Sequence, residues 1–76
     1  MRKAFITLTN AHGDYFGKRL DLDTGSIIAL QASSAKVEGV TKTRTEITCS
    51  VGGPPVTYIV VEDIDAVTRA LAAQEA

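Results

Sequence analysis

The stretch from Val56 to Asp63 constrains the fold of this chain more than any other part of it. Residues 56–61 read Val-Thr-Tyr-Ile-Val-Val, a run of β-branched and aromatic side chains that is typical of a β-strand. The run ends at two acidic residues, Glu62 and Asp63. Asp63 is a good helix N-cap, because its carboxylate can accept a free N–H of the first turn. The sequence therefore predicts a strand that turns directly into a helix.

The helix is expected over residues 63–73, where apolar side chains recur at helical spacing. Ile64, Val67 and Leu71 lie at i, i+3 and i+7, so they share one face. Asp65 adds negative charge in the first turn, where the helix dipole favours it. The apolar face must pack on another element, and we expect that element to be the open face of a sheet.

Strands are predicted along most of the chain before the helix. The predicted strands are Ala4–Thr9, Tyr15–Leu22, Ile27–Ala32, Thr45–Val51 and Val56–Val61. The strand from Ile27 is short and apolar, so we expect it to be well buried. The strand from Thr45 alternates with a period of two, which directs every second residue from Thr45 to Val51 inward. The last two strands are expected to pair antiparallel across the break at residues 52–55.

Residues 33–43 are rich in Ser, Thr and Lys, and two structures remain open for them. One is a loose loop, and the other is the end of a longer hairpin that reverses at Glu38-Gly39. With either structure, the predicted fold class is mainly β (α+β). We expect a small antiparallel sheet or half-open barrel of about five strands with one C-terminal helix, in a single domain spanning residues 1–76.

The length of 76 residues limits how much core the domain can bury. A domain of this size buries only about 60–65% of its unfolded surface, and small domains commonly add disulfides, a metal or a partner subunit. Cys49 is the single cysteine, so no disulfide can form within the chain, and Cys49 with His12 cannot complete a zinc site. Self-association and a core that is just sufficient remain, and of these two we expect a homo-oligomer.

The same cysteine indicates the compartment, because a free thiol suits a reducing cytosol. The N-terminal apolar run is interrupted by threonines and is too short for a signal peptide, and no run reaches the roughly 20 residues of a membrane span. The sequence predicts a cytoplasmic protein, either bacterial or encoded by a virus and acting in its host's cytoplasm.

Charge limits the class of partner. Eight Lys and Arg residues against nine Asp and Glu residues give a net charge of −1, which argues against non-specific nucleic-acid binding. Local basic groups remain, and their members are the candidate binding residues Lys36, Lys42, Arg44, Lys18 and Arg19. If these side chains share one face, they could bind nucleic acid, or a small anionic ligand between subunits. Solvated strand and loop faces are the simpler interpretation.

Asp23-Thr24-Gly25 is the sharpest chemical motif in the chain. It follows apolar strand residues and is similar to the active-site turn of aspartic proteases, in which two aspartates share a proton and activate water. The apolar-Gly motif that packs behind that turn is missing, because Ile59-Val60-Val61 continues into Glu62. Asp-Thr-Gly is also ordinary turn chemistry. A dimeric aspartic protease using Asp23 is thus a remote alternative.

Other polar residues indicate no chemistry. Asp21 and Asp23 with Gly25 lack the further carboxylates of a calcium loop. His12 has no nucleophile beside it, and Cys49 takes an inward strand position that suits a small buried apolar residue. We therefore expect no catalytic residue, no metal site and no cofactor.

Two parts of the chain resemble the FlbD-like family of small flagellar-operon proteins. The first is Ile-Thr-Leu-Thr at residues 6–9, followed by a glycine turn and the apolar run at 27–30. The second is the strand from Thr45, the Gly52-Gly53 turn, and Tyr-Ile-Val-Val-Glu-Asp at residues 58–63. The connection at 33–44 is longer than in the family, and the prolines at 54 and 55 depart from its pattern. The resemblance implies the same small β fold and no catalytic residues.

The function predicted from these observations is that of a non-enzymatic, regulatory binding module that docks on a protein partner as a homo-oligomer. The expected contact surfaces are residues 33–44 and any unpaired strand edge, because an open edge can accept an added strand.

Overall fold

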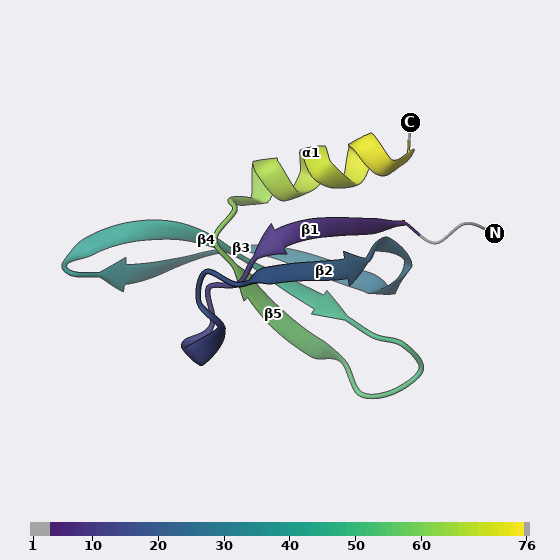
Figure 1. The fold of residues 1–76 in the computed structure, drawn as a ribbon, viewed down its shortest axis with the longest axis horizontal. Coiled ribbons are helices and arrows are strands. Elements are labelled where there is room, and N and C mark those ends of the chain that lie inside the picture. Colours follow the sequence, from purple (N-terminus) through teal and green to yellow (C-terminus); the bar gives the residue numbers. More distant parts are fainter. Residues whose placement is uncertain (1–3, 76) are drawn as a thin grey trace.

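The computed structural model describes residues 4–75, which form a mainly β structure with a C-terminal helix (Figure 1). The strands are β1 (Phe5–Thr9), β2 (Arg19–Asp23), β3 (Ile27–Val37), β4 (Val40–Cys49) and β5 (Val56–Val60); the helix is α1 (Ile64–Glu75), and two 3-10 turns are η1 (Gly13–Tyr15) and η2 (Thr24–Ser26). The predicted fold class is confirmed. Residues 1–3 and 76 of the predicted domain lie outside the described residues.

The strands form two antiparallel sheets, one of β1 and β2 and the other in the order β3-β4-β5. Backbone hydrogen bonds join the sheets where β1 ends beside β5: the Ala11 N–H donates to the Ile59 carbonyl at 2.9 Å, and the Val61 N–H donates to the Thr9 carbonyl at 2.9 Å. On the other side β2 continues through η2 into β3 without a ladder between these two strands. The two sheets together are therefore curved but do not close into a barrel, which agrees with the predicted half-open arrangement.

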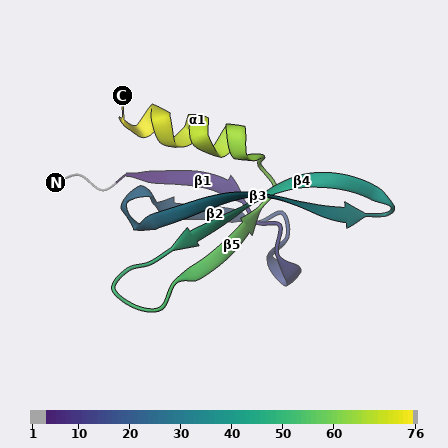
Figure 2. The same cartoon turned by 180° about the vertical axis from the view of Figure 1, so that it is seen from behind.

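The core lies between the sheets and the helix. Its buried apolar residues are Ile6, Leu8, Leu22, Ile47, Cys49, Val60 and Val67. The helix runs along β1 and also contacts β3 and β4 (Figures 1 and 2). Val67 is completely buried, and the Ala66 N–H donates to the Asp63 carboxylate at 2.8 Å. The predicted N-cap and apolar helix face are confirmed, although the helix reaches Glu75 instead of ending at residue 73.

The predicted strand from Tyr15 begins too early. Residues 13–15 form η1, and Gly17 has a φ of +82°, which lets the chain reverse before β2 starts at Arg19. Phe16 is consequently exposed and does not join Leu20 and Leu22 on the inner side. The reversal is held by the Gly17 N–H, which donates to the Asn10 carbonyl at 2.8 Å.

Two burial predictions are also wrong. The strand from Ile27 was expected to be short and buried, but β3 extends to Val37 and Ile28 is 61% exposed. The reason is position, because β3 lies at the edge of its sheet and leaves the core as it proceeds. Val51 was expected to face inward with Thr45, Ile47 and Cys49; those three are buried, but β4 ends at Cys49 and Val51 is 85% exposed in the turn.

Candidate functional site

The most prominent surface feature is a hairpin made by the far ends of β3 and β4. It projects from the body along the longest dimension of the molecule, which measures 45 Å against 28 and 20 Å in the other directions (Figures 1 and 2). Of the two structures considered for residues 33–43, the longer hairpin is correct, and it reverses at Glu38-Gly39 as predicted. We call residues 33–44 the projecting hairpin.

The turn of the projecting hairpin determines which backbone groups face outward. Glu38 and Gly39 have φ values of +52° and +80°, the combination that a two-residue type I′ turn requires. In such a hairpin the flanking pair, Val37 and Val40, exchanges both ladder hydrogen bonds, and the pairs then alternate. Ser34 and Thr43, which lie opposite each other, consequently direct their N–H and C=O groups away from the hairpin.

Both edges of the projecting hairpin are therefore open. β3 has β4 as its single neighbour within the described sheet. β5 pairs with β4 only from Thr45 to Cys49, so among residues 4–75 the β4 edge has no strand beside it from Val40 to Arg44. An unpaired edge is a template for strand addition from another chain, so the expected contact surface at 33–44 has the backbone geometry that this mode of binding needs.

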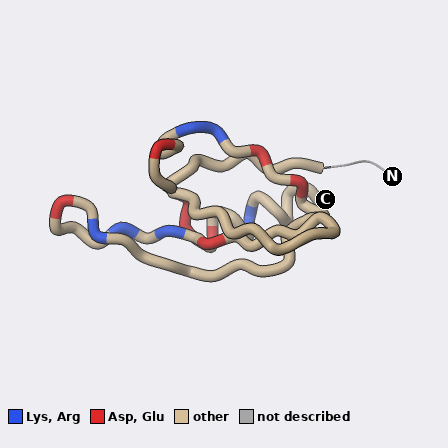
Figure 3. Tube along the Cα trace, turned by 90° about the horizontal axis from the view of Figure 1, so that it is seen from below, with Lys and Arg blue, Asp and Glu red and all other residues tan. Residues whose placement is uncertain are grey.

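The predicted basic residues of the hairpin do not share one face. Lys36 lies opposite Thr41, whereas Lys42 and Arg44 lie opposite Ala35 and Ser33. Because side chains alternate along a strand, Lys36 points to one face of the hairpin and Lys42 to the other. The basic positions along the hairpin are seen in Figure 3. The alternative of nucleic-acid or anion binding required all five side chains to share one face, and the hairpin does not meet this condition.

Arg44 differs from the two lysines because it is only 8% exposed. Its guanidinium lies over the Phe16 ring, 5.8 Å from the ring centre, and donates to the Thr43 carbonyl at 3.1 Å. A cation over an aromatic face is stabilised by the ring quadrupole. Arg44 thus anchors the loop before β2 to the base of the hairpin and is not free to meet a partner.

Lys18 and Arg19 lie outside the hairpin, at the start of β2. Lys18 is exposed, but the Arg19 Nε donates to the Asp21 carboxylate at 3.0 Å. This contact lowers the pKa of Asp21 and raises that of Arg19, and a hydrogen bond from the Thr7 hydroxyl at 2.7 Å lowers the Asp21 pKa further. Arg19 is exposed but paired with Asp21, whereas Lys18, Lys36 and Lys42 are exposed and lie outside this ion pair.

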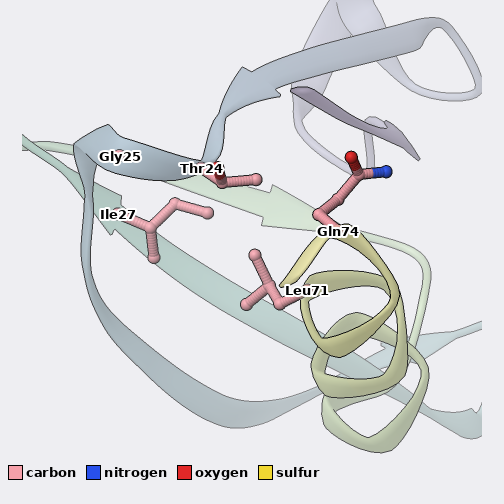
Figure 4. Close-up of a pocket in the computed structure, with 5 residues that line it drawn as sticks. All are labelled: Thr24, Gly25, Ile27, Leu71 and Gln74. Atoms are coloured by element: carbon pink, nitrogen blue, oxygen red, sulfur yellow. The ribbon is translucent and has the colours of Figure 1, made fainter. Parts of the chain in front are cut away.

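Asp23 lies where η2 begins, beside a shallow groove of about 370 Å³ between this turn and the end of α1 (Figure 4). Its carboxylate accepts the Gly25 N–H at 2.9 Å, so it caps the turn. The groove is lined by Thr24, Gly25, Ile27, Leu71 and Gln74. Among the side chains that the structure describes, this lining has apolar, hydroxyl and amide groups and no carboxylate.

A second groove, of about 410 Å³, was not anticipated from the sequence. It is lined by Asn10, His12, Tyr15, Leu20, Val56, Thr57 and Tyr58. The two tyrosines come from η1 and β5, which are far apart in the chain, so only the tertiary fold brings them together. The groove is open to solvent and combines ring surface with polar atoms.

Glu62 is a further residue whose role the sequence did not indicate. Its carboxylate accepts the backbone N–H and the hydroxyl of Thr9, both at 3.0 Å, and its carbonyl accepts the hydroxyl of the fully buried Thr45 at 2.8 Å. Glu62 therefore joins β1, β4 and the end of β5 at the point where the two sheets meet. This is a structural role.

In residues 4–75, no group of three or more His, Cys, Asp or Glu side chains is placed to hold a metal ion. No described helix is both long and apolar enough to cross a membrane. No family model, curated protein or solved structure matches the chain. The resemblance to FlbD-like proteins therefore stays a prediction from the sequence.

Proposed function

We propose that this chain is a non-enzymatic binding module that docks on a protein partner through the tip of the projecting hairpin. The observation that carries the proposal is the exposure of apolar surface on an element that projects from the body. Val37 and Val40 form the last pair of the ladder and are 40% and 54% exposed, although neither contributes to the core. Exposed apolar side chains on a projecting element suit burial against another molecule.

The charges around this valine pair define the kind of partner. Lys36 and Lys42 lie within two residues of the pair, one on each face of the hairpin, and both are exposed. Such a tip fits an apolar depression with acidic residues on its rim, because rim charges steer association and an apolar centre supplies affinity. We therefore propose that the partner is a protein with such an acidic-rimmed apolar depression.

The test is binding to a partner captured with a photo-crosslinker at position 40 and then purified. The variant K36E/K42E reverses both tip charges without touching the core, and we expect its Kd to rise at least tenfold, or about 1.4 kcal/mol. K18E is the matched control, since Lys18 is exposed but lies away from the tip. Equal affinity of wild type and K36E/K42E, or an equal loss in K18E, would contradict the proposal.

A further inference from the structure

The edge strands of the two sheets differ in how well they are protected against the addition of another strand. β3 carries no charged residue from Ile27 to Ala35, and its single charge is Lys36 near the tip. β2, the outer strand of the other sheet, is short and contains Arg19, Asp21 and Asp23. Short length and charged side chains are the usual protection of an edge against strand addition, and β3 has neither along most of its length.

From this contrast, and building on the proposed role of the hairpin in docking, we infer that the β3 edge pairs antiparallel with the β3 edge of a second copy of this chain. The ladder between β3 and β4 has an irregularity between Ile27 and Ala29, and it is regular from Ala29 to Val37. The midpoint of this regular part is Ser33. A two-fold axis at Ser33 brings the two regular segments fully into register.

The resulting pairs are compatible in both hydrogen bonding and charge. Ala32 of each copy lies opposite Ser34 of the other, and both residues direct their N–H and C=O groups outward, so they form a hydrogen-bonded pair. Gln31 meets Ala35, and Leu30 meets Lys36, whose aliphatic stem can cover it. No like charges lie opposite each other in this register.

The β4 edge does not meet these conditions. Its unpaired segment, Val40 to Arg44, has its midpoint at Lys42. A symmetric pairing there would place Lys42 of one copy directly opposite Lys42 of the other, and like charges in that position are destabilising. Self-association therefore selects the β3 edge. It leaves the β4 edge, with Val40 and Lys42, accessible to a different partner.

The experiment compares two proline variants at residues that face each other across the hairpin. S34P removes an outward N–H from the β3 edge, and T43P removes the equivalent N–H from the β4 edge; neither breaks a hydrogen bond between the two strands. Sedimentation velocity at about 100 μM, a concentration well above a micromolar Kd, should give a dimer for wild type and for T43P, and a monomer for S34P. A wild-type monomer, or a dimer that T43P abolishes, would overturn the inference.

The register has its own test. Across an antiparallel pair without hydrogen bonds the Cα atoms lie about 4.5 Å apart, within the range that a disulfide spans. S33C should therefore form a covalent dimer under mild oxidation, while wild type should not, because Cys49 is buried. V51C, in an exposed turn, is the control for non-specific crosslinking. Failure of S33C to crosslink, or crosslinking of V51C to the same extent as S33C, would contradict a two-fold axis at Ser33. Partner binding by the S34P monomer, measured with and without K36E/K42E, separates the failure of this inference from failure of the proposed function.

Discussion

At the scale of single residues, the carboxylate of Asp21 accepts side-chain hydrogen bonds on the surface of the β1-β2 sheet. Asp21 receives the Arg19 guanidinium and the Thr7 hydroxyl, which stabilise its charged form and lower its pKa. A folded-state pKa below the unfolded value means that this carboxylate contributes stability above the unfolded pKa and loses that contribution as the pH falls through the folded pKa. The effect belongs to the acid range, because Asp titrates near pH 4 when unperturbed.

We predict that R19A raises the pKa of Asp21 towards its ordinary value and that T7A raises it by less. R19A has the larger effect because the hydrogen bond from Arg19 lowers the pKa of Asp21 more than the hydrogen bond from Thr7 does. An NMR titration of the Asp21 carboxyl carbon measures both variants, with the carboxyl of Asp65, which lies on the helix, as an internal control. A larger change in T7A than in R19A would show that the dominant contact has been assigned to the wrong donor.

At the scale of elements, the projecting hairpin depends on an unusual turn residue. Glu38 adopts a φ of +52°, a left-handed conformation that asparagine and glycine accept more readily than glutamate. Gly39, with a φ of +80°, meets the requirement of the second turn position. The strain at Glu38 identifies a position where the natural residue is not the most stable one.

We predict that E38N stabilises the protein by about 0.5–1 kcal/mol, because asparagine visits the left-handed region at lower cost. Urea unfolding followed by far-UV circular dichroism measures the change. G39A provides the opposite case and should destabilise by about 1 kcal/mol, since alanine is strained at a positive φ. Destabilisation by E38N would mean that the Glu38 side chain makes a contact that outweighs its backbone strain.

Some of the secondary-structure elements could be predicted from the sequence alone, and others could not. The Asp63 cap, the helix stripe and the alternation of β4 around Ile47 each depend on neighbours in sequence, and each was predicted. The start of β2 and the length of β3 were not, because alternation continues through residues that the fold places in a turn or at an edge. Lys36 and Lys42 were grouped by proximity in sequence, and the hairpin then placed them on opposite faces.

At the scale of the whole molecule, the core and the projecting hairpin are separate. None of the buried apolar residues comes from residues 33–43, and the sheets are joined instead at Glu62, Thr9 and Thr45. The hairpin therefore adds exposed surface and little core. The body of the molecule thus holds the core, and the hairpin holds the exposed surface that we propose as the contact element.

We predict that the body folds without the end of the hairpin. Replacing residues 34–43 by Asn-Gly joins Ser33 to Arg44, a pair equivalent in hydrogen bonding to the natural flanking pair Val37 and Val40. The shortened protein should keep dispersed amide resonances and show a cooperative thermal transition as a monomer, but lose both self-association and partner binding. Loss of the folded spectrum would show that the hairpin contributes to folding.

The sequence by itself determined the fold class, the strand-to-helix transition after residue 61 and the burial of Cys49, because each depends on local propensity or on a period along the chain. For residues 33–43 it left a loop and a hairpin open, and the structure decided for the hairpin that reverses at Glu38-Gly39. Only the tertiary structure decided that β3 is an edge strand, that Arg44 is covered by Phe16 and that Tyr15 and Tyr58 share a groove. Edges, covered charges and grooves are formed by elements distant in sequence, and no local pattern encodes which of them will meet.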